Sequence, residues 1–194
     1  MQALDAAILD EAAAARARLT DYVDESFDIS VNLTNASLQW DGLVEAVENS
    51  VKTHGIFCSQ LCLEITEQDA ISSTEDVVHK IEELKAHGHR FLIDDFGMGH
   101  TSLLYLQTGF FAVVKLDGSL TRNVLENETN AEIIGSITKL GESIHFTTIA
   151  EWVESKEQLE KLKALGCDVF QGAYYSRAIG YEDLVEWLIS YRDS

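Results

Sequence analysis

Two kinds of hydrophobic pattern alternate along most of the chain. In the first, apolar residues recur every three or four positions, which is typical of helices with one buried side; these stripes span residues 4–19, 43–51, 77–84, 133–140, 159–165 and 184–188. In the second, short apolar runs have the length of strands, at residues 27–33, 61–66, 90–94, 111–116, 147–151 and 168–171. Strands separated by helices pair in parallel, so we expect an α/β fold.

Short turns connect these segments, without a glycine- or serine-rich linker or a sharp change of composition between them. The 194 residues therefore predict a single domain. A barrel of eight strand–helix units typically needs about 250 residues, so the chain is short for that fold.

Composition restricts the partners. The chain has 14 basic and 33 acidic residues and a net charge of −19, which disfavours binding to a nucleic acid polymer or to an anionic membrane. With 46% hydrophobic residues, it has ample material for a core. Because no apolar run has the length of a membrane helix and the N-terminus has no signal-peptide pattern, we expect a cytoplasmic protein without membrane insertion.

The cysteines and the histidines of a His-Gly-His run have simple structural interpretations. Cys58, Cys62 and Cys167 are an odd number, which favours reduced thiols that are buried as small hydrophobes. Cys58 and Cys62 could instead join a metal site. His87 and His89 are typical of a polar turn between a helix and a strand.

Polar residues stand at or just after the carboxyl end of each predicted strand: Asn32, Glu64 and Glu67, Asp94 and Asp95, Lys115, Glu151 and Glu154, and Gln171. In parallel α/β folds these strand ends form the binding face. Any one carboxylate alone is more simply a solvated or helix-capping residue, but the whole set favours a site for hard cations such as Mg²⁺, Mn²⁺ or Ca²⁺. Adjacent aspartates can reach two ions, the arrangement used to cleave phosphate esters.

Six ordered motifs make the chain resemble the EAL domain family, whose members hydrolyse cyclic di-GMP. The motifs are SVNLT at residues 30–34, LEITE at 63–67, DDFGMGHTSL at 94–103, VKLD at 114–117, AEWVE at 150–154 and GCDVFQG at 166–172. The resemblance implies a (β/α)8 fold like that of the TIM barrel. It also implies metal-dependent hydrolysis of one phosphodiester bond, with two Mg²⁺ or Mn²⁺ ions and linear pGpG as the product.

The resemblance also implies a set of metal ligands, namely Asn32, Glu64, Asp94, Asp95 and Glu151. Of these, Asp95 would serve the second ion and the attacking water, so it is also a candidate catalytic residue.

Four further residues receive roles from the same motifs. Lys115 would orient the water or balance charge on the phosphate, and Glu154 would support the metal ligands. Gln171 would hold water or substrate near the metals, and Glu67 would brace the Asp-Asp loop.

The resemblance begins after the family's first two strands, the second of which carries the Glu-Ala-Leu signature, and residues 1–23 resemble the helix that follows them. We therefore expect residues 1–194 to form a partial domain with about six of eight strands. Its unpaired sheet edges would favour a homodimer or a strand-complementing partner.

Three functions stay open at this point. The first is a cyclic di-GMP phosphodiesterase in bacterial second-messenger signalling. The second is a catalytically inactive relative that binds the nucleotide or a protein partner, and the third is another metal-dependent phosphohydrolase on the same fold.

Overall fold

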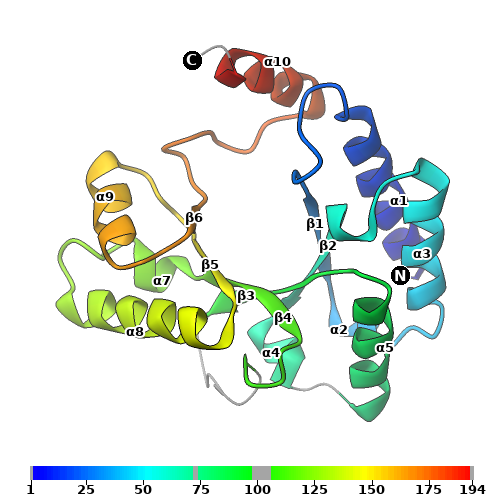
Figure 1. Ribbon diagram of the computed structural model, residues 1–194, viewed down its shortest axis with the longest axis horizontal. Helices are drawn as coiled ribbons and strands as arrows, with labels where there is room; N and C mark the ends of the chain where they lie inside the picture. Colours follow the sequence, from blue (N-terminus) through cyan, green and yellow to red (C-terminus); the bar gives the residue numbers. More distant parts are fainter. Residues whose placement is uncertain (1, 72–73, 98–105, 193–194) are drawn as a thin grey trace. The chain divides into compact units, whose positions relative to one another are not determined.

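The computed structural model describes residues 2–71, 74–97 and 106–192, and Figure 1 labels their helices and strands. The chain divides into two compact units. The first comprises Met1–Glu64, Ser73–Arg90 and Ala178–Ser194, and the second comprises Ile65–Ser72 and Phe91–Arg177. Residues 98–103 of the DDFGMGHTSL motif lie outside the described residues.

The first unit combines helices with two neighbouring strands, β1 and β2. Its elements are α1 (Gln2–Arg18), β1 (Ile29–Leu33), α2 (Asn35–Leu38), α3 (Leu43–His54), the 3-10 helix η1 (Cys58–Gln60), β2 (Leu61–Thr66, whose last two residues belong to the second unit), α5 (Glu75–Ala86) and α10 (Tyr181–Arg192). Helices α1 and α3 pack side by side (Figure 1). Leu43, Val47 and Val51 form the buried side of α3, as its stripe predicts.

The buried side of α1 differs from the predicted one. Leu4 and Ile8 of the predicted stripe are 62% and 45% exposed. The buried residues are Leu9, Ala13, Arg16 and Leu19, of which Leu19 belongs to the predicted stripe. The Arg16 guanidinium donates hydrogen bonds to the carbonyl oxygens of Phe27 and Asp24, at 2.7 and 3.0 Å. The hydrophobic pattern predicted a partly different side because one of the buried residues is charged and because the helix itself contains many alanines, which distinguish its sides poorly.

The second unit is a parallel sheet in the strand order β3, β4, β5, β6. Its elements are α4 (Glu67–Ile71), β3 (Phe91–Phe96), β4 (Phe111–Leu116), α7 (Gly118–Thr121), α8 (Glu128–Ile144), β5 (Thr147–Ala150), α9 (Lys156–Ala164) and β6 (Val169–Phe170). The structure thus has all six predicted strands, each within two residues of its expected ends, and the α/β class is confirmed.

Side-chain caps set where several helices begin. The hydroxyl oxygens of Thr34 and Ser155 accept hydrogen bonds from the third residue of α2 and α9, in capping boxes. Asp117 and Asn127 cap α7 and α8 by accepting hydrogen bonds from the amides of Ser119 and Asn130. The short helices α2, α4 and α7 were not expected, because four or five residues are too few to show a helical hydrophobic period.

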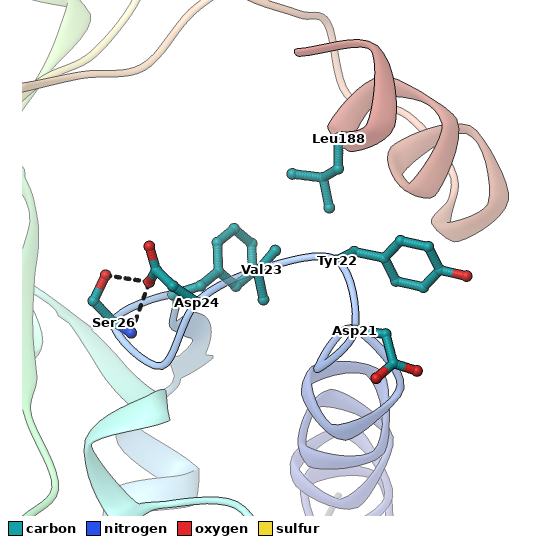
Figure 2. Close-up of a pocket in the computed structure, with 7 residues that line it drawn as sticks. Asp21, Tyr22, Val23, Asp24, Ser26 and Leu188 are labelled. Carbon is teal, nitrogen blue, oxygen red and sulfur yellow. Dashed lines mark hydrogen bonds between the residues drawn. The ribbon is translucent and has the colours of Figure 1, made fainter. Parts of the chain in front are cut away.

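A pocket of about 560 Å³ lies in the first unit, next to the turn that follows α1. Figure 2 shows the turn residues Tyr22 and Val23 below Leu188 of α10, and Asp24 accepting two hydrogen bonds from Ser26. The residues that line this pocket include none of the predicted site residues. No helix in the described part of the chain is both long enough and apolar enough to span a membrane.

Candidate functional site

A bulge in β3 directs two consecutive aspartates toward one place. In a regular strand, neighbouring side chains point to opposite faces of the sheet. Here the pairing of β3 with β4 shifts between Ile93 and Phe96, where β3 has one residue more than β4. Asp95 adopts a left-handed φ of 56° at this shift. The bulge therefore lets Asp94 and Asp95 approach the same neighbours, which is a common use of bulges near active sites.

Three carboxylates gather at the carboxyl ends of β3 and β5. Asp94, Asp95 and Glu151 each offer an oxygen, and these oxygens lie within 4.8 Å of one another. Lys115, at the end of β4, lies between two of them: its Nζ is 2.9 Å from Asp94 Oδ1 and 2.9 Å from Glu151 Oε1. We call these four residues the carboxylate cluster.

The carboxylate cluster holds more negative than positive charge. Lys115 and Glu151 are 6% and 8% exposed, so water screens their charges poorly. Burial raises the pKa of Glu151, the nearby Asp94 and Asp95 raise it further, and Lys115 opposes the shift. Burial also raises the pKa of Asp95, with Asp94 and Asp117 adding to the effect. Three carboxylates that share one ammonium group favour the binding of a further cation.

The donor atoms of the carboxylate cluster fit a hard divalent cation. All three are carboxylate oxygens, which Mg²⁺, Mn²⁺ and Ca²⁺ prefer, and the cluster contains neither the thiolate nor the imidazole typical of zinc sites. Two adjacent aspartates can bind one ion each or share one. The residues present are therefore suited to divalent metal.

Two more of the predicted residues lie beside the carboxylate cluster. Glu67 begins α4, is 8% exposed, and its Oε2 accepts a hydrogen bond from the Gly97 amide at 3.2 Å, just after the two aspartates. Gln171 follows β6; its amide donates to Ala150 O at 2.9 Å, and its carbonyl accepts from Val153 N at 3.1 Å. These backbone bonds hold Gln171 next to the residue pair Glu151–Trp152, while its side chain stays exposed.

Three predicted residues are not members of the carboxylate cluster. Glu154 is exposed, and its amide donates to Gln158 Oε1 at 2.8 Å, ahead of α9. Asn32 of β1 is exposed and Glu64 of β2 is 6% exposed; both belong to the first unit. Their approach to the carboxylate cluster stays a prediction.

A residue that none of the sequence motifs contains fixes the backbone of Glu151. Thr121 is fully buried, and its hydroxyl donates to the Glu151 carbonyl oxygen at 2.6 Å. Thr121 reaches this position because Asp117 caps α7, accepting from the Ser119 amide at 2.7 Å. The Asp-Gly-Ser sequence directly after β4 was the available signal, since it is typical of a helix start.

Replacing Asp95 with asparagine is expected to stabilise the metal-free protein at neutral pH, raising Tm by about 1–2 °C. Asparagine tolerates the left-handed φ and removes a carboxylate whose pKa is raised by burial and by neighbouring carboxylates. A raised pKa means that the folded protein binds this proton more tightly than the unfolded chain does. The wild type therefore regains stability relative to the variant as the pH falls through that pKa.

Thermal unfolding in a chelator, recorded from neutral to acidic pH, measures this difference. If the gain in Tm of Asp95→Asn over the wild type does not shrink as the pH falls, its cause is the backbone conformation and not the charge.

Comparisons with known proteins identify the family and the fold. The model of the EAL domain family matches residues 1–178. The bifunctional diguanylate cyclase/cyclic di-GMP phosphodiesterase MucR of Pseudomonas aeruginosa is 33% identical over 178 residues, which cover 92% of this chain and 26% of that protein. The structure of the MucR phosphodiesterase in complex with c-di-GMP superposes with a TM-score of 0.87 at 32% identity, covering 93% of this chain and 73% of that one.

A second relative was solved with metal. The manganese and cyclic di-GMP complex of Klebsiella pneumoniae BlrP1 matches with a TM-score of 0.79 at 28% identity, covering 87% of this chain and 43% of that one. The chain spans about a fifth to a quarter of the length of the curated relatives that it matches first. The likeness confirms the predicted barrel-like α/β fold. With a family match that covers all six motifs, the chain belongs to the EAL domain family.

Proposed function

We propose that this chain hydrolyses one phosphodiester bond of cyclic di-GMP to give linear pGpG, with Mg²⁺ or Mn²⁺. The observation that carries the proposal is the carboxylate cluster, in which three carboxylate oxygens lie within 4.8 Å of one another and Lys115 pairs with two of the carboxylates. Relatives that are named as phosphodiesterases of this nucleotide, or that were solved with it, support the choice of substrate.

Asp94, Asp95 and Glu151 hold the metal in this proposal, and Asn32 and Glu64 complete the ligand set. Bound divalent ions neutralise phosphate charge and lower the pKa of the attacking water. Because Thr121 fixes the Glu151 backbone and the bulge fixes the two aspartates, the ligands need little rearrangement. Such preorganisation is the main protein contribution to this kind of catalysis.

Asp95 accepts the proton of the attacking water. Its carboxylate lies together with those of Asp94 and Glu151, so it is within reach of a water in the metal site. The water oxygen forms a new bond to phosphorus, the bond from phosphorus to the ribose 3′ oxygen breaks, and that oxygen leaves as a hydroxyl after taking up a proton. Lys115 supplies positive charge next to the reacting phosphate.

The remaining predicted residues have supporting roles in the proposal. Glu67 braces the Asp94–Asp95 segment through its hydrogen bond with Gly97. Gln171, held beside Glu151 by its backbone, binds water or substrate with its exposed side chain. Glu154 supports the metal ligand Glu151 through the segment that joins Glu151 to α9.

We further propose cytoplasmic action and pairing with a second copy or with a strand-complementing partner. β6 supports the pairing, because it ends the strand order of its sheet and its Val169 is 44% exposed. Analytical ultracentrifugation at several protein concentrations tests it, and a monomer at all of them would contradict it.

A product assay tests the main proposal. The purified chain is incubated with cyclic di-GMP and Mn²⁺ or Mg²⁺, and the nucleotides are separated by ion-exchange chromatography. We expect pGpG to accumulate with metal and to be absent in the presence of a chelator. Calorimetric binding of cyclic di-GMP without turnover would instead support a non-catalytic binding role, and the absence of both binding and turnover would contradict the proposal.

A further inference from the structure

A second cluster of potential metal ligands lies in the first unit and has a different chemistry. Glu48 of α3, Cys58 of η1 and His89 before β3 each offer one donor atom, and these atoms lie within 4.8 Å of one another. His87 adds a second imidazole, whose Nδ1 is 3.0 Å from Glu48 Oε1. We call Glu48, Cys58, His87 and His89 the thiol–imidazole cluster.

A tight turn brings the two histidines to the same carboxylate oxygen. α5 ends at Ala86, and Gly88 adopts a left-handed φ of 98°, which glycine alone adopts without strain. The turn is fixed by hydrogen bonds from the His89 and Gly88 amides to carbonyl oxygens at the end of α5. A Cβ at Gly88 would lie 3.7 Å from the Cys58 Cβ, so the turn packs directly against the cysteine. The positions of these donors are therefore set by the backbone.

His89 has a conflict that a cation would remove. Its side chain is fully buried, its Nε2 is 3.0 Å from Glu48 Oε1, and its Nδ1 is 3.5 Å from the Leu61 carbonyl oxygen. Burial lowers the pKa of His89, which favours a neutral ring with a single N–H. One of the two nitrogens then presents a lone pair to an oxygen. With the proton on Nδ1, facing the Leu61 carbonyl, the lone pair of Nε2 is available to a metal, as in many ligating histidines.

The thiol of Cys58 distinguishes this cluster from an ordinary pair of His–Glu contacts, because it adds a sulfur donor. Cys58 is partly exposed, whereas Cys62 and Cys167 are buried; burial raises the pKa of all three thiols, to about 12 for Cys62 and Cys167. Cys62 and Cys167 thus match the expected buried thiols, and Cys58 differs from them in its exposure and in having Glu48 and His89 as neighbours. One sulfur, two imidazole nitrogens and one carboxylate oxygen are the donors that zinc selects, and they suit Mg²⁺ or Ca²⁺ poorly.

We propose that Glu48, Cys58, His87 and His89 form a structural zinc site, separate from the carboxylate cluster. Glu48, Cys58 and His89 supply three ligands, and His87, which contacts the same Glu48 oxygen, would complete the four of a closed shell, which is typical of structural rather than catalytic zinc. The ion would connect α3, η1 and the turn between α5 and β3. Because such a site exists only in the folded chain, zinc would stabilise the fold without taking part in hydrolysis.

Cobalt(II) substitution tests the site by a spectroscopic signature. We expect the full chain, freed of metal under a phosphine reductant, to develop thiolate-to-cobalt charge-transfer absorption that added zinc removes. Cys58→Ser should abolish this absorption, whereas Cys167→Ser and His79→Gln, which change a buried thiol of the second unit and an exposed histidine of α5, should retain it. Absence of the absorption in the wild type, or its persistence in Cys58→Ser, would overturn the proposal.

Thermal unfolding gives a second, independent measurement. In an Asp94→Asn background, where the carboxylate cluster lacks one ligand, zinc at about 100 times its dissociation constant should raise Tm by about 5–10 °C. Glu48→Gln should weaken zinc binding by at least about 10-fold. If zinc raises Tm equally in Asp94→Asn and in the double variant that also carries Glu48→Gln, the proposed site is contradicted. Neither measurement depends on cyclic di-GMP, so failure of the proposed hydrolysis would leave both results unchanged.

Discussion

The Asp94→Asn variant is expected to lose cyclic di-GMP hydrolysis by at least about 100-fold while keeping its fold. Asp94 Oδ1 is 2.9 Å from Lys115 Nζ, and the side chain is only 17% exposed. The change preserves the shape of the side chain but removes the negative charge of a metal ligand, and the loss of a ligand costs more than the 10- to 100-fold typical of outer residues. The initial rate of pGpG formation at several Mn²⁺ concentrations measures the effect.

A matched control separates the metal site from general charge effects. Asp183→Asn removes the same charge from an exposed position in the first turn of α10. We expect it to hydrolyse cyclic di-GMP at the wild-type rate. If Asp94→Asn keeps wild-type activity and wild-type Mn²⁺ affinity, Asp94 is not a metal ligand and the proposed function has lost its main support.

The sheet and the main site residues were accessible from sequence because both follow from local patterns. Strand-length apolar runs predicted all six strands, and the polar residues at their carboxyl ends include Asp94, Lys115 and Glu151, which the structure brings together. A residue at the carboxyl end of a parallel strand has a defined place, so its position along the chain is enough to locate it.

Other features depend on contacts that no local pattern shows. The bulge that directs both Asp94 and Asp95 toward Glu151 is a mismatch in register between two strands, which neither strand shows by itself. The buried side of α1 depends on Arg16 meeting carbonyl oxygens 8 and 11 residues away. Cys58 was grouped with Cys62 in sequence, but its neighbours in the structure come from α3 and the end of α5.

The Lys115→Met variant is expected to lower the stability of the metal-free protein by about 3 kcal/mol, or roughly 6–12 °C in Tm. Methionine fills a similar volume but leaves Asp94 and the buried Glu151 without their shared ammonium group, and breaking a buried ion pair on one side is costly. Acidification should restore part of the loss, because the pKa of Glu151 is raised already and a protonated Glu151 needs no counter-charge. Thermal unfolding in a chelator measures both effects.

Added Mn²⁺ should then stabilise Lys115→Met more than it stabilises the wild type, because the cation replaces the missing positive charge. Lys80→Met is the matched control: Lys80 is also buried and lies 2.6 Å from Asp76 Oδ2, but neither residue belongs to the carboxylate cluster or to the proposed metal ligands, so Mn²⁺ should not rescue its loss. Lys115→Met should still fail to form pGpG although its metal ligands are intact, because the positive charge beside the phosphate is gone. If Mn²⁺ stabilises Lys115→Met and the wild type equally, Lys115 and the metal do not share these carboxylates. If Lys115→Met forms pGpG at the wild-type rate, Lys115 has no role in the reaction.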